Sequence, residues 1–172
     1  MSAPPLVIRP VARSAALIAL ALAWASTLGH HPLQAQSIDD PTRLTGVDPV
    51  DVRAEASWDE AITMEAGGAT PAQFLEALQA TFGEAIAAAD AAPSVVEGAG
   101  TTIACHVDTF YDRGLIVYSL RVQTEAEGDD GRPVITWIKS DVGSYTVQQL
   151  HLMFRLGEQC ADLFLDDWRG AN

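Results

Sequence analysis

The chain has 172 residues, and its 23 Asp and Glu against 10 Lys and Arg give a net charge of −13 at pH 7. Nucleic acids and anionic membrane surfaces both bind cationic faces, so this charge argues against either as a partner. With 48% hydrophobic and 19% charged residues, the sequence is typical of a folded protein with one core rather than of a disordered chain.

Residues 1–35 differ in composition from the rest and predict a secretory signal peptide. Their only charged side chains are Arg9 and Arg13, which precede an apolar run over residues 15–28. That run is shorter than the roughly 20 residues of helix that cross a bilayer core. An uncleaved anchor is the alternative interpretation.

We expect the signal peptide to be cleaved after Ala35, because Leu33-Gln34-Ala35 carries small or aliphatic residues at the positions that a signal peptidase reads. Cleavage after Ala25 is a second alternative. Either cut predicts an exported protein, periplasmic or extracellular, that keeps no membrane span.

Residues 36–49 contain Asp, Pro and Gly without hydrophobic periodicity, which predicts a flexible lead-in. From Val50 to Asp59 apolar and polar residues alternate strictly, which is typical of a half-buried strand. Its apolar side comprises Val50, Val52, Ala54, Ala56 and Trp58. Gly67-Gly68 follows and interrupts the pattern.

A helix is predicted to begin after Thr70, because Thr70 can cap it, Pro71 suits its first position and Gln73 can complete a capping box. Pro93 should end the helix near Ala91-Ala92. The predicted apolar face comprises Phe74, Leu78, Phe82, Ala85, Ile86 and Ala89.

Three strands should follow, over about 101–111, 115–125 and 134–139, joined by short turns at Asp112-Arg113-Gly114 and Gly128–Gly131. Turns this short imply an antiparallel meander.

Thr146 and Gln149 form a second capping box, which opens a helix that runs to about Trp168. The order of elements predicts a single α+β domain over residues 50–172, with one mixed sheet and two helices packed on one face.

Cys105 and Cys160 are the only cysteines, and in an exported chain an even count favours a disulfide. Cys105 shares a strand face with Ile103 and Val107, so its thiol should point into the core. Cys160 belongs to a stripe with helical spacing, made up of Leu150, Met153, Phe154, Gly157, Cys160, Ala161, Phe164 and Trp168. A thiol nucleophile that uses His106 or His151 as its base is the alternative.

No nucleophile elbow, zinc-protease motif or phosphate-binding loop occurs in the sequence, and neither a metal nor a cofactor is expected. The acidic hairpin over residues 125–130 predicts a solvated turn, with a weak calcium site as the alternative. Arg121 and Lys139 should form cross-strand ion pairs. Three tryptophans could line a ligand groove but fit core positions better: Trp58, Trp137 and Trp168.

Short motifs mark the last third of the chain: Thr136-Trp137, then Asp141-Val142-Gly143, then residues 164–172, which read Phe-Leu-Asp-Asp-Trp-Arg-Gly-Ala-Asn. This succession resembles a family of small uncharacterised exported bacterial proteins, in which a Thr-Trp strand, a Val-Gly turn and a final helix follow one another. The strands at 107–110 and 118–122 are also similar to that family. The resemblance covers about residues 50–172 and implies export, but it brings neither an activity nor catalytic residues, and it does not include the two cysteines.

Both predicted helices commit their apolar stripes to the core, so the sheet face opposite them and the exposed edge strand are the surfaces available for recognition. The candidate interaction face comprises His106, Asp108, Arg121 and Gln123. The sequence therefore predicts a non-catalytic exported domain, an accessory or protein-interaction module of the cell envelope. Two alternatives remain: a small periplasmic enzyme that uses His and carboxylates on that face, and a carrier of a small apolar ligand. The partner and the oligomeric state stay open.

Overall fold

The computed structural model describes residues 39–67 and 69–172; the predicted signal peptide lies outside the described residues. Within them the elements, in chain order, are η1 (Pro41–Leu44), β1 (Asp51–Ser57), α2 (Glu60–Ala66), α3 (Pro71–Ala88), β2 (Thr101–Asp112), β3 (Leu115–Glu127), β4 (Pro133–Thr146), η2 (Val147–Gln149), α4 (Leu150–Met153) and α5 (Leu156–Ala171).

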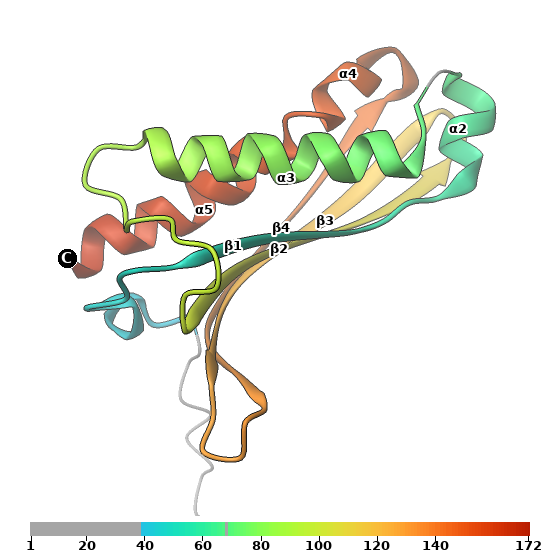
Figure 1. The fold of residues 1–172 in the computed structure, drawn as a ribbon. Coiled ribbons are helices and arrows are strands. Elements are labelled where there is room, and N and C mark those ends of the chain that lie inside the picture. The colour runs from blue at the N-terminus through green and yellow to red at the C-terminus, as the bar shows by residue number, and fades with distance from the viewer. Residues whose placement is uncertain (1–38, 68) are drawn as a thin grey trace, which may run out of the picture. The chain divides into compact units, whose positions relative to one another are not determined.

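The four strands form one mixed sheet in the order β1-β2-β3-β4. β1 pairs parallel with β2, whereas β2, β3 and β4 form an antiparallel meander. The long helices α3 and α5 lie side by side over the same face of this sheet (Figure 1). The predicted α+β class with one mixed sheet is confirmed.

Some elements differ from prediction. α2 was not predicted; it begins after Asp59, because that carboxylate accepts a hydrogen bond from the main-chain N–H of Ala61 at 2.9 Å. α3 has the predicted Thr70–Gln73 capping box but ends at Ala88, before the expected stop. β4 continues to Thr146 instead of ending at Lys139.

The predicted last helix is broken into η2, α4 and α5. The main chain turns between Met153 and Leu156, so the capping box of Thr146 and Gln149 opens η2, while α5 begins later. The predicted apolar stripe still reaches the core, because Met153, Cys160 and Phe164 are all buried.

The described part of the predicted flexible lead-in, residues 39–49, is packed onto the domain, so that prediction is wrong there. Leu44 is fully buried in the core. The side chain of Asn172 holds the segment, since its amide donates to the carbonyl of Leu44 at 3.2 Å and its oxygen accepts from the N–H of Gly46 at 3.1 Å. The sequence did not predict this contact, because Leu44 is a single apolar residue in a segment without hydrophobic periodicity.

The core fills the space between the sheet and the two long helices. Its largest fully buried side chains include Trp137, Phe74, Phe82 and Phe164. Trp137 packs edge-on against Phe164 with ring centroids 5.9 Å apart. The tryptophans at 137 and 168 are therefore core residues, as expected.

A disulfide joins Cys105 on β2 to Cys160 on α5, with Cα atoms 6.0 Å apart. This confirms the predicted pairing and excludes the thiol nucleophile, because both sulfurs are bonded and buried. The bond also fixes the orientation of β2: Cys105 faces the helices, so its neighbour His106 faces away from them.

Two glycines permit close approaches. A Cβ at Gly157 on α5 would lie 2.6 Å from both the carbonyl of Leu78 and the main-chain N of Phe82, so α3 and α5 meet with their backbones almost in contact. A Cβ at Gly143 would overlap the ring of Tyr118, which lies across β4.

Tyr118 belongs to a hydrogen-bonded group between β3, β4 and α5. Its hydroxyl donates to the side-chain oxygen of Gln159 at 3.3 Å, and the Gln159 amide donates to the hydroxyl of Tyr145 at 2.8 Å. Burial, followed by the hydrogen bond with Tyr145, raises the pKa of Tyr118 to about 12.

This shift predicts a loss of stability in alkali. Because the folded pKa of about 12 exceeds the ordinary value of 10.0, folding is favoured fully below pH 10 and loses this contribution as the pH rises toward 12. In urea unfolding over that range, Tyr118→Phe should show a weaker pH dependence than the wild type. An equal dependence in both proteins would contradict the assignment to Tyr118.

The outer edge of β1 is covered by the protein's own groups. The N–H of Ala54 donates to the side-chain oxygen of Gln79 at 2.6 Å, and the Gln79 amide donates to the carbonyl of Val52 at 3.0 Å. Val50 makes two main-chain hydrogen bonds with residues 94–96, of 3.0 and 2.8 Å. These contacts occupy main-chain groups of Val50, Val52 and Ala54 that an added strand would need.

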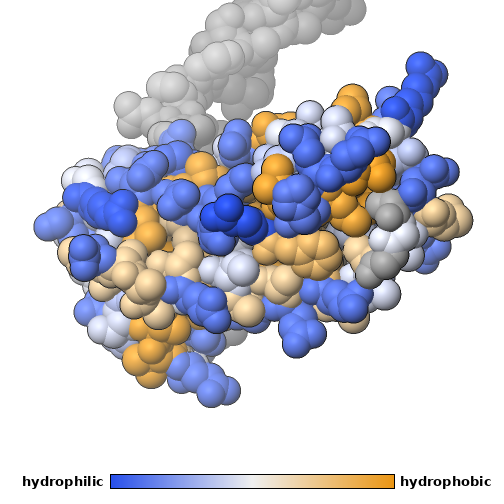
Figure 2. All heavy atoms as spheres, turned by 90° about the horizontal axis from the view of Figure 1, so that it is seen from above, coloured by the Kyte–Doolittle hydropathy of each residue, from blue (hydrophilic) through white to orange (hydrophobic). Residues whose placement is uncertain are grey.

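The surface above the helical layer carries hydrophilic and hydrophobic side chains interspersed with one another (Figure 2). Within the part of the chain that the structure describes, no helix is both long enough and apolar enough to cross a membrane.

Candidate functional site

The four residues of the predicted interaction face lie together on the two central strands. His106 and Asp108 belong to β2, Arg121 and Gln123 to β3, and the register places His106 directly opposite Arg121. We call the sheet surface that faces away from the helices the outer sheet face. Its residues include Arg53, Glu55, Ser57, Ala104, His106, Asp108, Arg121, Gln123, Glu125, Ile138, Ser140 and Val142.

The four side chains differ in how far a partner could reach them. Asp108 and Arg121 are exposed. The side chain of His106 is only 14% exposed, and Gln123 is buried. A partner could therefore reach Asp108 and Arg121 directly, whereas His106 and Gln123 lie largely below the surface.

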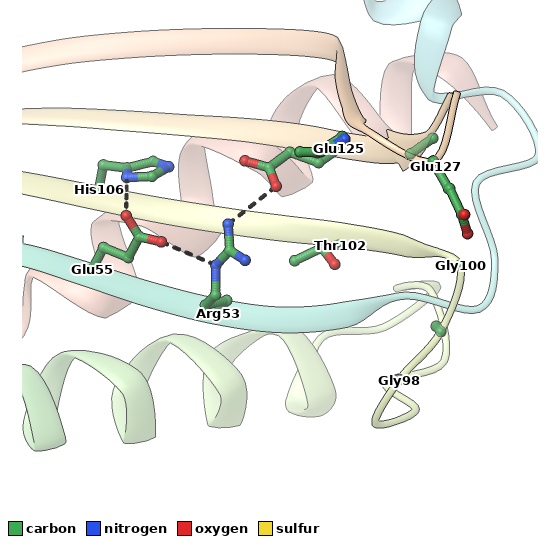
Figure 3. A pocket seen from close by; sticks show the side chains of 12 residues that line it. Arg53, Glu55, Gly98, Gly100, Thr102, His106, Glu125 and Glu127 are labelled. Carbon is green, nitrogen blue, oxygen red and sulfur yellow. Dashed lines mark hydrogen bonds and ion pairs between the residues drawn. The ribbon is translucent and has the colours of Figure 1, made fainter. Parts of the chain in front are cut away.

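A continuous set of polar contacts links Gln123 and His106 to side chains of β1, and Figure 3 shows its ion pairs. The Gln123 amide donates to Glu125, whose other oxygen lies 3.0 Å from Nη2 of Arg53. Nε of Arg53 lies 3.2 Å from Glu55, and the other oxygen of Glu55 lies 3.1 Å from Nδ1 of His106. One guanidinium thus bridges two carboxylates, and one of these orients the imidazole.

The pair of Arg53 and Glu125 should count for more than an exposed ion pair, because the side chain of Glu125 is only 12% exposed. Removing Arg53 would leave a poorly solvated carboxylate without its cation, which is costly. Glu125 was predicted to lie in a solvated turn, and this prediction is wrong, because Glu125 is an ion-paired residue of β3.

Sequence reasoning missed Arg53 and Glu55 as members of this site. The alternation of β1 placed both on its polar side, but the parallel pairing of β1 with β2 brings Glu55 beside His106. That pairing joins segments separated by two helices, and no local signal in the sequence specifies its register.

A hollow of about 610 Å³ opens on the outer sheet face over these contacts. Arg53, Glu55, His106 and Glu125 line its floor, while the loop at 98–100 and the β3–β4 hairpin border it (Figure 3). Both borders turn at glycines with positive φ, 72° at Gly98 and 74° at Gly131. A smaller hollow of about 260 Å³ is lined by Ser57, His106, Asp108 and Arg121, among others.

The imidazole of His106 is held rather than free. Its Nδ1 contacts Glu55, whereas its Nε2 is shielded from solvent and has no hydrogen-bond partner among the described residues. A substrate could reach this nitrogen only if the ring or its surroundings moved. Within residues 39–67 and 69–172, no three His, Cys, Asp or Glu side chains are grouped so that they could hold a metal ion.

One of two further residues, Lys139, lies elsewhere than predicted. Lys139 faces the helices, where its Nζ contacts Asp167 of α5 at 2.7 Å, so the predicted cross-strand pair is wrong for it. His151 is exposed on α4 and lines a separate hollow of about 490 Å³ with Leu150 and Phe154.

No family model matches the chain, and no curated protein matches its sequence. Over the described residues the fold is an α+β domain whose long helices cover one face of the sheet and leave the other face without a helix. The resemblance to a family of exported bacterial proteins stays a prediction.

Proposed function

We propose that the protein is a non-catalytic exported domain that binds a protein or envelope component, as an accessory or interaction module of the bacterial cell envelope. One observation carries the proposal. The long helices bury their apolar side chains in the core, whereas no described helix covers the opposite sheet face, which carries a hollow lined by charged side chains.

The disulfide supports the exported location. Such bonds persist in oxidising compartments and are rare in the cytosol. A bonded Cys105–Cys160 pair in the core agrees with the signal peptide predicted for residues 1–35.

The charges around the hollows favour a partner with a cationic segment. Four carboxylates line them, against the two guanidinium groups of Arg53 and Arg121, and Arg53 is already shared between two of these carboxylates. The four carboxylates are those of Glu55, Asp108, Glu125 and Glu127. Because potentials are complementary across specific interfaces, a Lys- or Arg-containing segment fits this surface best.

Charge reversal at the rim of the hollows tests the proposal. Asp108→Lys and Glu127→Lys change exposed side chains, so both variants should fold normally and bind the partner at least about tenfold more weakly. The partner would be captured with the tagged protein from its native envelope, and thermal unfolding would check each variant.

Asp129→Lys is the matched control, because it makes the same charge change on the β3–β4 hairpin outside the residues that line the hollow. If the control abolishes capture while the two rim variants preserve it, the outer sheet face is not the binding surface.

A small enzyme is the second candidate, favoured by the contact of 3.1 Å between Glu55 and Nδ1 of His106. A carboxylate that orients an imidazole in this way is a common feature of general-base catalysis. Turnover of chromogenic ester, phosphate or glycoside substrates that is lost in His106→Gln would support this candidate. Such turnover in the wild type that survives His106→Gln would exclude His106 as the base.

The carrier of an apolar ligand gains no support from the region between the helices and the sheet. Large side chains fill that region, with Phe74, Phe82 and Trp137 fully buried.

A further inference from the structure

The second half of β4 is an exposed edge whose main chain points away from the sheet. The turn at Arg113 and Gly114 has φ values of 47° and 90°, as in a two-residue hairpin, so its flanking pair Asp112–Leu115 is hydrogen-bonded. From this pair onward, residue pairs of β2 and β3 that exchange hydrogen bonds alternate with pairs that do not. The main-chain N–H and C=O groups of Tyr118, Leu120 and Val122 therefore point toward β4.

Their partners on β4 are Gly143, Asp141 and Lys139, which bond back toward β3. The residues between and before them, Ile138, Ser140 and Val142, must direct their N–H and C=O groups outward. The hydrogen bond of 2.8 Å from the N–H of Val142 to the carboxylate of Asp141 agrees with this direction.

This edge is accessible only in part. Near its beginning, the carbonyl of Thr136 accepts a hydrogen bond from Arg43 at 3.4 Å, so the η1 segment covers it. Further along, Ser140 and Asp141 are exposed, and Val142 is 69% exposed although it is apolar. An exposed edge with unpaired main-chain N–H and C=O groups is a site for strand addition.

We propose that β4 pairs with β4 of a second copy of this chain, antiparallel about a two-fold axis at Ser140. In this register the outward main-chain groups of residues 138, 140 and 142 face those of residues 142, 140 and 138 in the second copy. They form three bonded pairs once the N–H of Val142 exchanges the carboxylate of Asp141 for the second copy, and the sheet becomes continuous across the axis.

The side chains along β4 are self-complementary in that register. On the outer sheet face, Ile138 lies opposite Val142 of the second copy. On the helical face, Lys139 lies opposite Asp141 of the second copy, and symmetry repeats both pairs. An axis at Lys139 or at Asp141 would place like charges directly opposite each other, which is destabilising.

Lys139 can serve this pair without losing its contact inside the domain. Its ammonium lies 2.7 Å from Asp167, but the side chain is 33% exposed and carries three N–H donors. This charge complementarity selects a second copy as the occupant of the edge. The inference does not depend on what the outer sheet face binds.

Light scattering coupled to size-exclusion chromatography, on the protein with its disulfide intact, tests the proposal. The wild type should be a dimer, and Ser140→Pro should be a folded monomer. Proline removes an N–H that points away from β3, so the ladder with β3 is kept.

A charge-swap experiment tests the register and does not rely on proline. Asp141→Lys alone should be monomeric, because it places two lysines opposite each other, and Lys139→Glu alone should be monomeric because it places two acids opposite each other. Mixing the two variants should restore a dimer, since every cross-strand pair then joins opposite charges. Asp129→Lys, with the same charge change away from β4, should stay dimeric.

A wild type that stays monomeric over a wide concentration range would overturn the proposal. So would a dimer that persists in both Ser140→Pro and Asp141→Lys, because its interface would then lie elsewhere.

Discussion

Replacing Gly157 with alanine should destabilise the domain by about 3 kcal/mol, at the upper end of the usual cost of overpacking. The added Cβ would meet the carbonyl of Leu78 and the main-chain N of Phe82, each at 2.6 Å. These are backbone atoms, which cannot rotate aside as a side chain would. α3 and α5 must therefore separate, and the packing of the core between them is lost.

Gly170→Ala is the matched control for this substitution, because it lies on the same helix and its Cβ would have no atom within 4 Å. Alanine favours a helix more than glycine does, so this variant should be neutral or gain up to about 1 kcal/mol. Urea unfolding measures both. If Gly157→Ala were as stable as the wild type, α3 and α5 would not be in such close contact.

Cys160→Ala should cost about 2 to 5 kcal/mol of folding free energy, the range for native disulfides of small secreted domains. The bond links positions 55 residues apart, so its loss frees a long loop in the unfolded chain. Urea unfolding with and without a reductant measures the effect. The wild type should lose stability in the reductant, and Cys160→Ala should not respond to it.

Peptide mapping without reduction provides an independent check on the same bond. Recovery of Cys105 and Cys160 as free thiols from protein kept oxidised would contradict the pairing, and no effect of reductant on the wild type would then be expected.

Much of the fold could be predicted because its signals are local. The Thr70–Gln73 capping box, the alternation from Val50 and the short hairpin turns each specify their element within a few residues. α2 was missed because its only strong signal is the capping carboxylate of Asp59.

β4 was predicted to end too early, and this has a physical cause. After Lys139 the strand is an edge, where one side of the main chain meets solvent, so polar residues such as Ser140 and Asp141 are tolerated and the pattern resembles a turn.

The candidate site was predictable only on the antiparallel strands. Once Cys105 was expected to face the core, alternation placed His106 and Asp108 on the other face, and the hairpin brought Arg121 and Gln123 beside them. Arg53 and Glu55 reach the same place through the parallel pairing of β1 with β2, which depends on how α3 packs on the sheet rather than on any local pattern.

The side chain of Gln79 has a consequence for aggregation. A sheet that is open at both edges can add molecules repeatedly and grow into a fibre. Here the amide of Gln79 and the main chain of residues 94–96 occupy the edge of β1 over residues 50–54, as a neighbouring strand would. A strand that joins at β4 therefore finds residues 50–54 of β1 already occupied at the opposite edge of the sheet, which hinders further growth beyond a single addition.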